Sequence, residues 1–89
     1  MRYKIKLTGK AKKDLEILER NIQKRVVNKL RFYLKSGDPL QYAKKLKNDR
    51  LGEYRFRIGD YRIIFDIDKE GNINILIILR IKHRKEVYG

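Results

Sequence analysis

The feature that most constrains the fold is a pair of alternating runs on either side of Gly59-Asp60. Residues 54–58 and 61–65 are rich in aromatic and β-branched side chains that alternate with arginine. A dipeptide that begins with glycine suits the two-residue type II′ turn of a hairpin. The pattern therefore predicts a β-hairpin in which Ile58 lies opposite Tyr61.

The two faces of this hairpin are predicted to have opposite chemistry. One face is expected to belong to the core, and it holds three cross-strand pairs: Ile58 with Tyr61, Phe56 with Ile63, and Tyr54 with Phe65. The other face carries Arg55, Arg57 and Arg62, and it sets Arg57 directly opposite Arg62. Like charges in that position destabilise a hairpin by roughly 0.2–1 kcal/mol. Repulsion of this kind inside a sheet indicates an anionic ligand.

A strand and a helical region are predicted before the hairpin. Residues 2–7 alternate apolar with basic side chains, which is the pattern of a half-buried strand. Thr8 is the predicted N-cap of a helix that extends to about Arg20, and apolar residues recur at steps of three or four as far as Leu34. Asn21 is placed to cap a second helix. The region is therefore either a helical hairpin or one long kinked helix.

The sequence Ser36-Gly37-Asp38-Pro39 ends the helical region, because glycine suits a helix C-terminus and proline cannot continue the helix. A loop or short helical turn follows, and it is crowded with cations. These residues either contact RNA phosphates, which requires charge but little geometric precision, or form a solvated basic loop. They are Lys44, Lys45, Lys47 and Arg50.

A last strand is predicted after a turn at residues 68–72. Its nearly continuous apolar run, from Ile75 to Leu79, is typical of a central strand that is covered on both sides. Strict alternation places Ile73, Ile75, Ile77, Leu79 and Ile81 on one face, and Asn74, Leu76, Ile78, Arg80 and Lys82 on the other.

The order of elements is thus β-α-α-β-β-β, which predicts an α+β fold. We expect one domain over residues 1–89, with a small, mainly antiparallel four-stranded sheet and an N-terminal helical hairpin packed on one face.

Composition narrows the class of partner. The 89 residues include 24 Lys and Arg against 11 Asp and Glu, a formal net charge of +13. Residues 1–50 hold 16 basic and 5 acidic side chains, net +11, so most of the charge lies in the N-terminal half. Such a surplus favours nucleic acid as the ligand. The alternative, a thermophilic surface, also calls for abundant Glu, which this chain lacks.

The chain contains no cysteine, so thiolate metal sites and cysteine nucleophiles are excluded. It shows no apolar run near the ~20 residues of a membrane span and no signal-peptide core. We expect a cytoplasmic protein that uses neither a metal nor another cofactor, without membrane contact.

The candidate chemistry is cleavage of RNA. Arg55, Arg57, Arg62 and either Arg80 or Lys82 are expected to converge on the open sheet face, where fixed cations stabilise a phosphodiester that gains charge in its transition state. RNA supplies its own nucleophile, the 2′-hydroxyl, so a metal is unnecessary. The base is either Tyr88, whose phenolate nearby cations favour, or His83, whose reference pKa near 6.5 needs less perturbation. Strict alternation places His83 on the face opposite to Lys82.

The hairpin, the last strand and the ending Lys82-His83-Arg84-Lys85-Glu86-Val87-Tyr88 together resemble the RelE/ParE toxin superfamily, and RelE-type mRNA interferases in particular. The resemblance implies ribosome-dependent cleavage of mRNA, which leaves a 2′,3′-cyclic phosphate and a 5′-hydroxyl and inhibits translation. It assigns Arg55 and Arg57 to the substrate phosphates and Arg62 to catalysis. Lys82 takes the place of a family arginine proposed as general acid, with Arg84 as its substitute, and Tyr88 takes that of the general base.

The resemblance also implies a RelB-like antitoxin, acidic or amphipathic, that wraps the toxin, together with the ribosome and mRNA as partners. Two other functions stay open. One is a ParE-like toxin that inhibits gyrase, on the same fold. The other is a basic RNA- or DNA-binding domain without catalysis.

Overall fold

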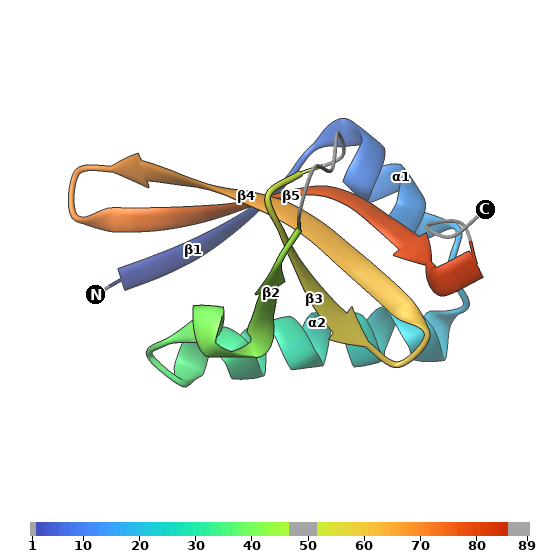
Figure 1. Ribbon diagram of the computed structural model, residues 1–89. Coiled ribbons are helices and arrows are strands. Elements are labelled where there is room, and N and C mark those ends of the chain that lie inside the picture. The colour runs from blue at the N-terminus through green and yellow to red at the C-terminus, as the bar shows by residue number, and fades with distance from the viewer. Residues whose placement is uncertain (1, 47–51, 86–89) are drawn as a thin grey trace.

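The computed structural model describes residues 2–46 and 52–85 of the chain. These residues form two α-helices, one short 3₁₀ helix and five strands (Figure 1). In chain order they are β1 (Arg2–Leu7), α1 (Gly9–Glu16), α2 (Arg20–Lys35), η1 (Pro39–Tyr42), β2 (Ala43–Lys45), β3 (Tyr54–Ile58), β4 (Tyr61–Glu70) and β5 (Ile73–His83). No helix among the described residues is long and apolar enough to cross a membrane.

All five strands belong to one sheet, in the order β1-β5-β4-β3-β2. Only the pair β1 and β5 is parallel, so the predicted α+β class with a mainly antiparallel sheet is confirmed. The fifth strand, β2, differs from the four-stranded expectation. It lies where a loop or helical turn was predicted, and Ala43 pairs with Phe56. Three residues, two of them lysine, are too few to show an alternating pattern.

The central hairpin has the predicted register. Ile58 pairs with Tyr61 and Arg57 pairs with Arg62, and Gly59 has a φ of 60°, as the first position of a type I′ or II′ turn requires. The next turn is shorter than predicted. Because β4 continues to Glu70, which pairs with Ile73, only two residues connect β4 to β5. Charged side chains at the end of β4 are exposed and therefore do not interrupt the strand.

A β-bulge in β5 overturns the strict alternation predicted for that strand. Ile81 pairs with Ile63 and Ile78 pairs with Phe65, which leaves Leu79 as an extra residue in β5. Ile78 and Ile81 therefore both face the core, although they are three positions apart. Strict alternation had predicted that Leu76 and Ile78 share a face with Arg80 and Lys82. This prediction was wrong, because the bulge places the two pairs on opposite faces of the sheet.

The helical region consists of two helices, which settles the alternative left open by the sequence. Thr8 is the N-cap of α1, and its hydroxyl oxygen accepts a hydrogen bond from Ala11 N at 3.1 Å, as predicted. The boundaries differ, because α1 ends at Glu16 and the N-cap of α2 is Glu19, not Asn21. The side-chain amide of Gln23 donates to the carbonyl groups of Glu16 and Leu18, and so satisfies the end of α1.

One core lies between the helices and one face of the sheet. The helices contribute Ala11, Val26, Leu30 and Tyr33, and Phe56 and Phe65 stack behind them with ring centroids 4.4 Å apart. The three predicted core pairs of the hairpin all lie in or against this core. The opposite face of the sheet is the face turned to the viewer in Figure 1, and the described helices leave it uncovered.

Candidate functional site

The register of the sheet aligns three cations from three adjacent strands. Arg57 of β3 pairs with Arg62 of β4, and Arg62 pairs with Lys82 of β5. Directly opposed side chains share a face, with Cβ atoms about 4.5–5.5 Å apart. Arg62, at the centre, is only 8% exposed, so its charge lies where water screens it least.

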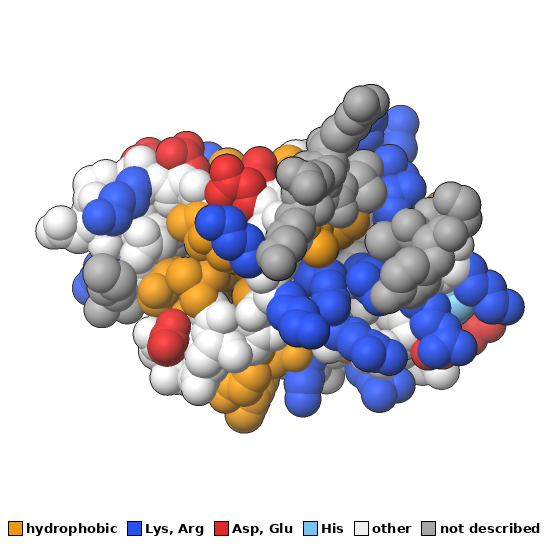
Figure 2. Space-filling model, viewed as in Figure 1, with side chains coloured by type: hydrophobic (Ala, Val, Ile, Leu, Met, Phe, Trp, Pro, Cys, Tyr) orange, Lys and Arg blue, Asp and Glu red, His pale blue; other side chains and the backbone are white. Residues whose placement is uncertain are grey.

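A second row runs parallel to the first. Lys44 of β2 pairs with Arg55, Arg55 pairs with Ile64, and Ile64 pairs with Arg80. We call the sheet surface formed by the two rows the cationic face, and it consists of Lys44, Arg55, Arg57, Arg62, Ile64, Arg80 and Lys82. Figure 2 shows Lys and Arg side chains gathered over this part of the sheet.

Lys45 is separated from this face. It pairs with Tyr54, so it lies on the helix side of the sheet, whereas its neighbour Lys44 lies on the cationic face. Both lysines are exposed, and they differ mainly in the face that they occupy. Lys47, the third lysine expected to bind RNA from this connection, lies outside the described residues.

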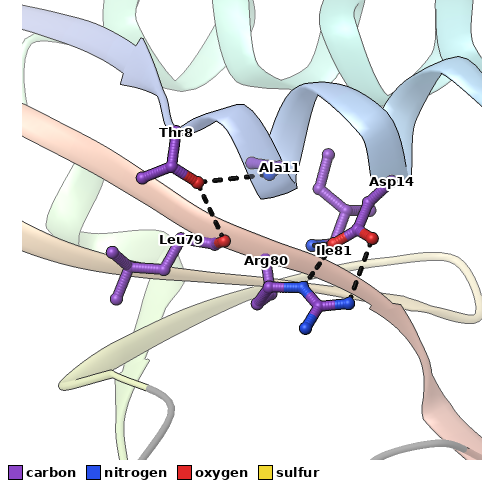
Figure 3. Close-up of polar contacts among 6 residues, drawn as sticks. All are labelled: Thr8, Ala11, Asp14, Leu79, Arg80 and Ile81. Atoms are coloured by element: carbon purple, nitrogen blue, oxygen red, sulfur yellow. Dashed lines mark hydrogen bonds and ion pairs between the residues drawn. The ribbon is translucent and has the colours of Figure 1, made fainter.

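Arg80 is anchored at the edge of the cationic face. Its Nε and Nη2 atoms donate to the two carboxylate oxygens of Asp14, at 2.8 and 3.1 Å (Figure 3). Ile81 N donates to the same carboxylate at 2.9 Å. Burial raises the pKa of Asp14, but the hydrogen bonds from Arg80 and Ile81 and the charges of Arg80 and Lys82 outweigh this effect, so the net pKa lies below its ordinary value of 3.8. Arg80 is thus held in one orientation by a carboxylate.

Beyond the end of β1, Thr8 and α1 form hydrogen bonds with the backbone of β5 along the same edge. Thr8 N donates to the carbonyl oxygen of Ile78 at 3.0 Å, and the Thr8 hydroxyl donates to that of Leu79 at 3.0 Å (Figure 3). Asp14 then accepts the next amide, that of Ile81. An exposed strand edge is a template for unwanted pairing, and these contacts occupy it beside the bulge.

The backbone at Gly52 lies very close to the side chains of Ile64 and Leu79 in the sheet. A Cβ atom on Gly52 would lie 2.7 Å from Ile64 Cγ2 and 3.0 Å from Leu79 Cδ1, so only glycine fits without movement of its neighbours. Glu53 N donates to Asp66 Oδ1 at 2.8 Å and holds this segment against β4. Neither Gly52 nor Asp14 could be identified from local sequence, because the partners of both are distant along the chain.

Arg84 lies at the tip of the central hairpin. Its backbone N donates to the carbonyl oxygen of Asp60 at 2.8 Å, and its Nε is 3.9 Å from Asp60 Oδ1. Both side chains are more than half exposed. Arg84 therefore remains accessible beside the end of β5.

Of the two candidate bases, the structure describes one. His83 pairs with Tyr61, and the two rings meet edge to face with centroids 5.2 Å apart. Tyr61 packs against the core, so His83 lies on the face opposite to Lys82, as alternation at this end of the strand predicted. Tyr88 lies outside the described residues. Among residues 2–46 and 52–85, no three His, Cys, Asp or Glu side chains gather as a metal site would require.

Comparison with known proteins places the chain in a family. Residues 5–88 match the family model described as the ParE toxin of the type II toxin–antitoxin system parDE. The chain belongs to the ParE toxin family. It is thus a toxin of a type II toxin–antitoxin system, within the RelE/ParE superfamily that the sequence resembles.

Relatives of this ParE-family chain carry RelE-type names. Toxin RelG of Mycobacterium tuberculosis is 34% identical over 88 residues, which cover 99% of the chain and 98% of that protein. The toxin–antitoxin complex RelBE2 of the same organism contains a chain with a TM-score of 0.74 and 29% identity, and the match covers 94% and 100% of the two chains. The RelB–RelE complex of Methanococcus jannaschii contains a chain with a TM-score of 0.60 and 28% identity. The match covers 92% of the present chain and 93% of that chain.

Proposed function

We propose that the chain is a ribosome-dependent mRNA endonuclease of the RelE type, acting in the cytoplasm. The observation that supports this function best is the row Arg57, Arg62 and Lys82, in which three strands place like charges side by side on the sheet face that the described helices leave uncovered (Figure 1). An RNA phosphate bound over this row would neutralise its charges.

The proposed reaction uses the substrate's own hydroxyl. The 2′-oxygen attacks phosphorus and loses its proton to a base, the bond from phosphorus to the 5′-oxygen breaks, and the leaving oxygen receives a proton. Arg62, which is 8% exposed, would stabilise the charge that develops on the phosphate oxygens. Lys82, opposite Arg62, is the proposed proton donor. Arg55, Arg57, Arg80, Arg84 and Lys44 would bind neighbouring phosphates.

We assign the general base to Tyr88. The other candidate, His83, packs its ring against Tyr61 on the helix side of the sheet. A base must reach the proton that it removes, either directly or through one water molecule. The position of His83 supports Tyr88 by elimination, and a Tyr88→Phe variant tests the assignment directly.

We further propose that a RelB-like antitoxin is the partner of the chain. RelBE2 and the M. jannaschii RelB–RelE complex are toxin–antitoxin complexes that each contain a chain with this fold. The chain offers an apolar recess of about 160 Å³ between β1 and the two helices. An amphipathic acidic segment would match both the recess and the net charge of +13. Residues lining the recess include Ile5, Leu7, Leu15, Val26, Leu30, Leu34 and Ile81.

Gyrase inhibition is the second candidate, and the description of the matching family as the ParE toxin favours it. A gyrase inhibitor would act by protein contact and would not depend on Arg62 as a catalyst. A substitution of Arg62 should therefore reduce mRNA cleavage if the chain is a nuclease, and should leave inhibition of gyrase unchanged if it is a gyrase inhibitor.

Primer extension on a defined mRNA, with and without ribosomes that have an empty A site, tests the proposal. Cleavage that requires ribosomes would support it. Arg62→Met, which retains side-chain bulk, should abolish cleavage while the variant keeps its fold, as circular dichroism would check. Arg20→Met, at the exposed start of α2, is the matched control. An absence of cleavage with ribosomes, together with inhibition of gyrase supercoiling, would establish the second candidate instead.

A further inference from the structure

A pair of exposed aromatic rings lies outside the cationic face. Phe32 of α2 is 53% exposed and Tyr42 of η1 is 39% exposed, and their ring centroids are 5.9 Å apart. Among the described residues, Ile17 is the other large apolar side chain exposed to this degree. Isolated apolar residues are normal on a surface, whereas these two adjacent rings form a small contiguous aromatic patch. We call Phe32 and Tyr42 the aromatic platform.

The aromatic platform is held in place by the core. The ring of Tyr42 stacks on that of Tyr33, with centroids 4.6 Å apart and planes at 23°. Tyr33 is 4% exposed, and its ring packs on Phe56 with centroids 4.7 Å apart. Burial, with Tyr42 beside it, raises the pKa of Tyr33, so this phenol stays protonated at neutral pH. A ligand would therefore meet rings that are already ordered, which lowers the entropic cost of binding.

A cation accompanies the rings. Lys29 Nζ lies 5.4 Å from the ring centroid of Phe32 and 5.9 Å from that of Tyr33. An apolar protein segment on this surface would have to remove water from the ammonium group, which is unfavourable. A nucleotide satisfies both features, because its base stacks on an aromatic ring and its phosphate neutralises the cation.

The aromatic platform adjoins the cationic face around the edge of the sheet. Tyr42 ends η1 immediately before β2, and Lys44 in β2 lies on the cationic face opposite Arg55. Two residues of a strand span about 6.6 Å. An RNA strand that crosses the rows from β5 to β2 would thus leave the cationic face at Lys44 and meet the aromatic platform next.

We propose that the aromatic platform stacks an unpaired base of the RNA strand whose phosphates lie on the cationic face. This inference rests on the proposed function. It extends the RNA-binding surface around β2 onto the helix layer, and it assigns Phe32 and Tyr42 to base stacking and Lys29 to the adjoining phosphate.

The test is fluorescence anisotropy with a labelled single-stranded oligoribonucleotide and purified protein at fixed salt. Phe32→Leu keeps an apolar side chain but removes the ring, and it should raise the Kd roughly fivefold or more, because stacking contributes about 1–3 kcal/mol per base. Phe32→Tyr should restore binding. Ile17→Ala, at the exposed C-cap of α1 and outside α2, is the control and should leave the Kd unchanged.

A second oligoribonucleotide, in which abasic positions replace the bases, separates stacking from charge. With that probe the Phe32→Leu variant and the wild type should bind equally, and the salt dependence of binding should be the same for both. Equal affinity of the two proteins for the normal oligoribonucleotide would overturn the proposal and point to a protein partner for this surface. An equal loss on the abasic probe would also overturn it.

These results can be distinguished from a failure of the proposed function. If the chain binds RNA in a Phe32-dependent manner but cleaves nothing on ribosomes, base stacking is supported and the nuclease assignment fails. If cleavage occurs while Phe32→Leu leaves the Kd unchanged, the nuclease assignment holds and base stacking fails.

Discussion

The carboxylate of Asp14 offers the sharpest test of how the cationic face is held. Asp14→Asn preserves shape but removes the charge, and it turns an amide NH₂ toward groups that are themselves donors. The carboxylate accepts two bonds from Arg80 and one from Ile81 N. Bonds to charged groups contribute about 1.5–3 kcal/mol each in general, whereas exposed ion pairs contribute at most about 1 kcal/mol.

The side chains of Arg80 and Asp14 are 30% and 14% exposed. Their pair is therefore intermediate between a buried charged hydrogen bond and an exposed ion pair. We therefore expect the substitution to lower the free energy of unfolding by about 2 kcal/mol. In a chain of this size that corresponds to a fall of roughly 8–16 °C in melting temperature. Glu16→Gln is the matched control, since it removes the same charge from an exposed position in α1 and should change stability by less than about 0.5 kcal/mol.

The dependence on pH provides the second half of this test. The folded-state pKa of Asp14 lies below its ordinary value of 3.8, so the carboxylate stabilises the fold fully above about pH 4. That contribution is lost as pH falls through the folded-state pKa. Thermal melts of wild type and Asp14→Asn should therefore differ at pH 7 and converge in acid. A melting temperature within 2 °C of wild type at pH 7, with about ±1 °C precision, would refute the anchoring role.

Three further substitutions test other parts of the structure. Thr8→Val removes the N-cap acceptor of α1 and should cost about 1–2 kcal/mol in urea titration, while an unchanged midpoint would exclude the cap. Gly52→Ala forces a Cβ to within 2.7 Å of Ile64 and should cost about 1–3 kcal/mol in thermal melts, while a stable variant would show that the segment shifts freely. Lys44→Ala should weaken RNA binding and lower the salt slope by about 0.7, whereas Lys69→Ala, at the exposed far end of β4, should leave both unchanged.

The central hairpin could be predicted from sequence because its determinants are local. The Gly59-Asp60 turn sets the register, and the register alone places Arg57 opposite Arg62. The cap of α1 was predictable for the same reason, because Thr8 and Ala11, whose amide donates to the Thr8 hydroxyl oxygen, are three residues apart. In each case a short run of sequence contains both partners of the interaction.

The remainder depends on contacts that no local pattern contains. The bulge at Leu79 lets both Ile78 and Ile81 face the core, although they are three positions apart. A period-two pattern in the sequence does not reveal where such an extra residue lies. Asp14 looked like an ordinary helix residue, since its partner Arg80 is 66 positions away. Strand β2 was missed because its pairing with β3 is its main distinguishing feature.

The central position of β5 also has a consequence for synthesis of the toxin. Both of its neighbours in the sheet, β1 and β4, precede it in the chain, and α1 is bonded to it across 71 residues, from Thr8 to Leu79. A nascent chain that has not yet released residues 73–83 has neither a closed core nor the Lys82 end of the cationic row. We therefore expect the core and the cationic row to form together, once β5 is available to pair with β1 and β4.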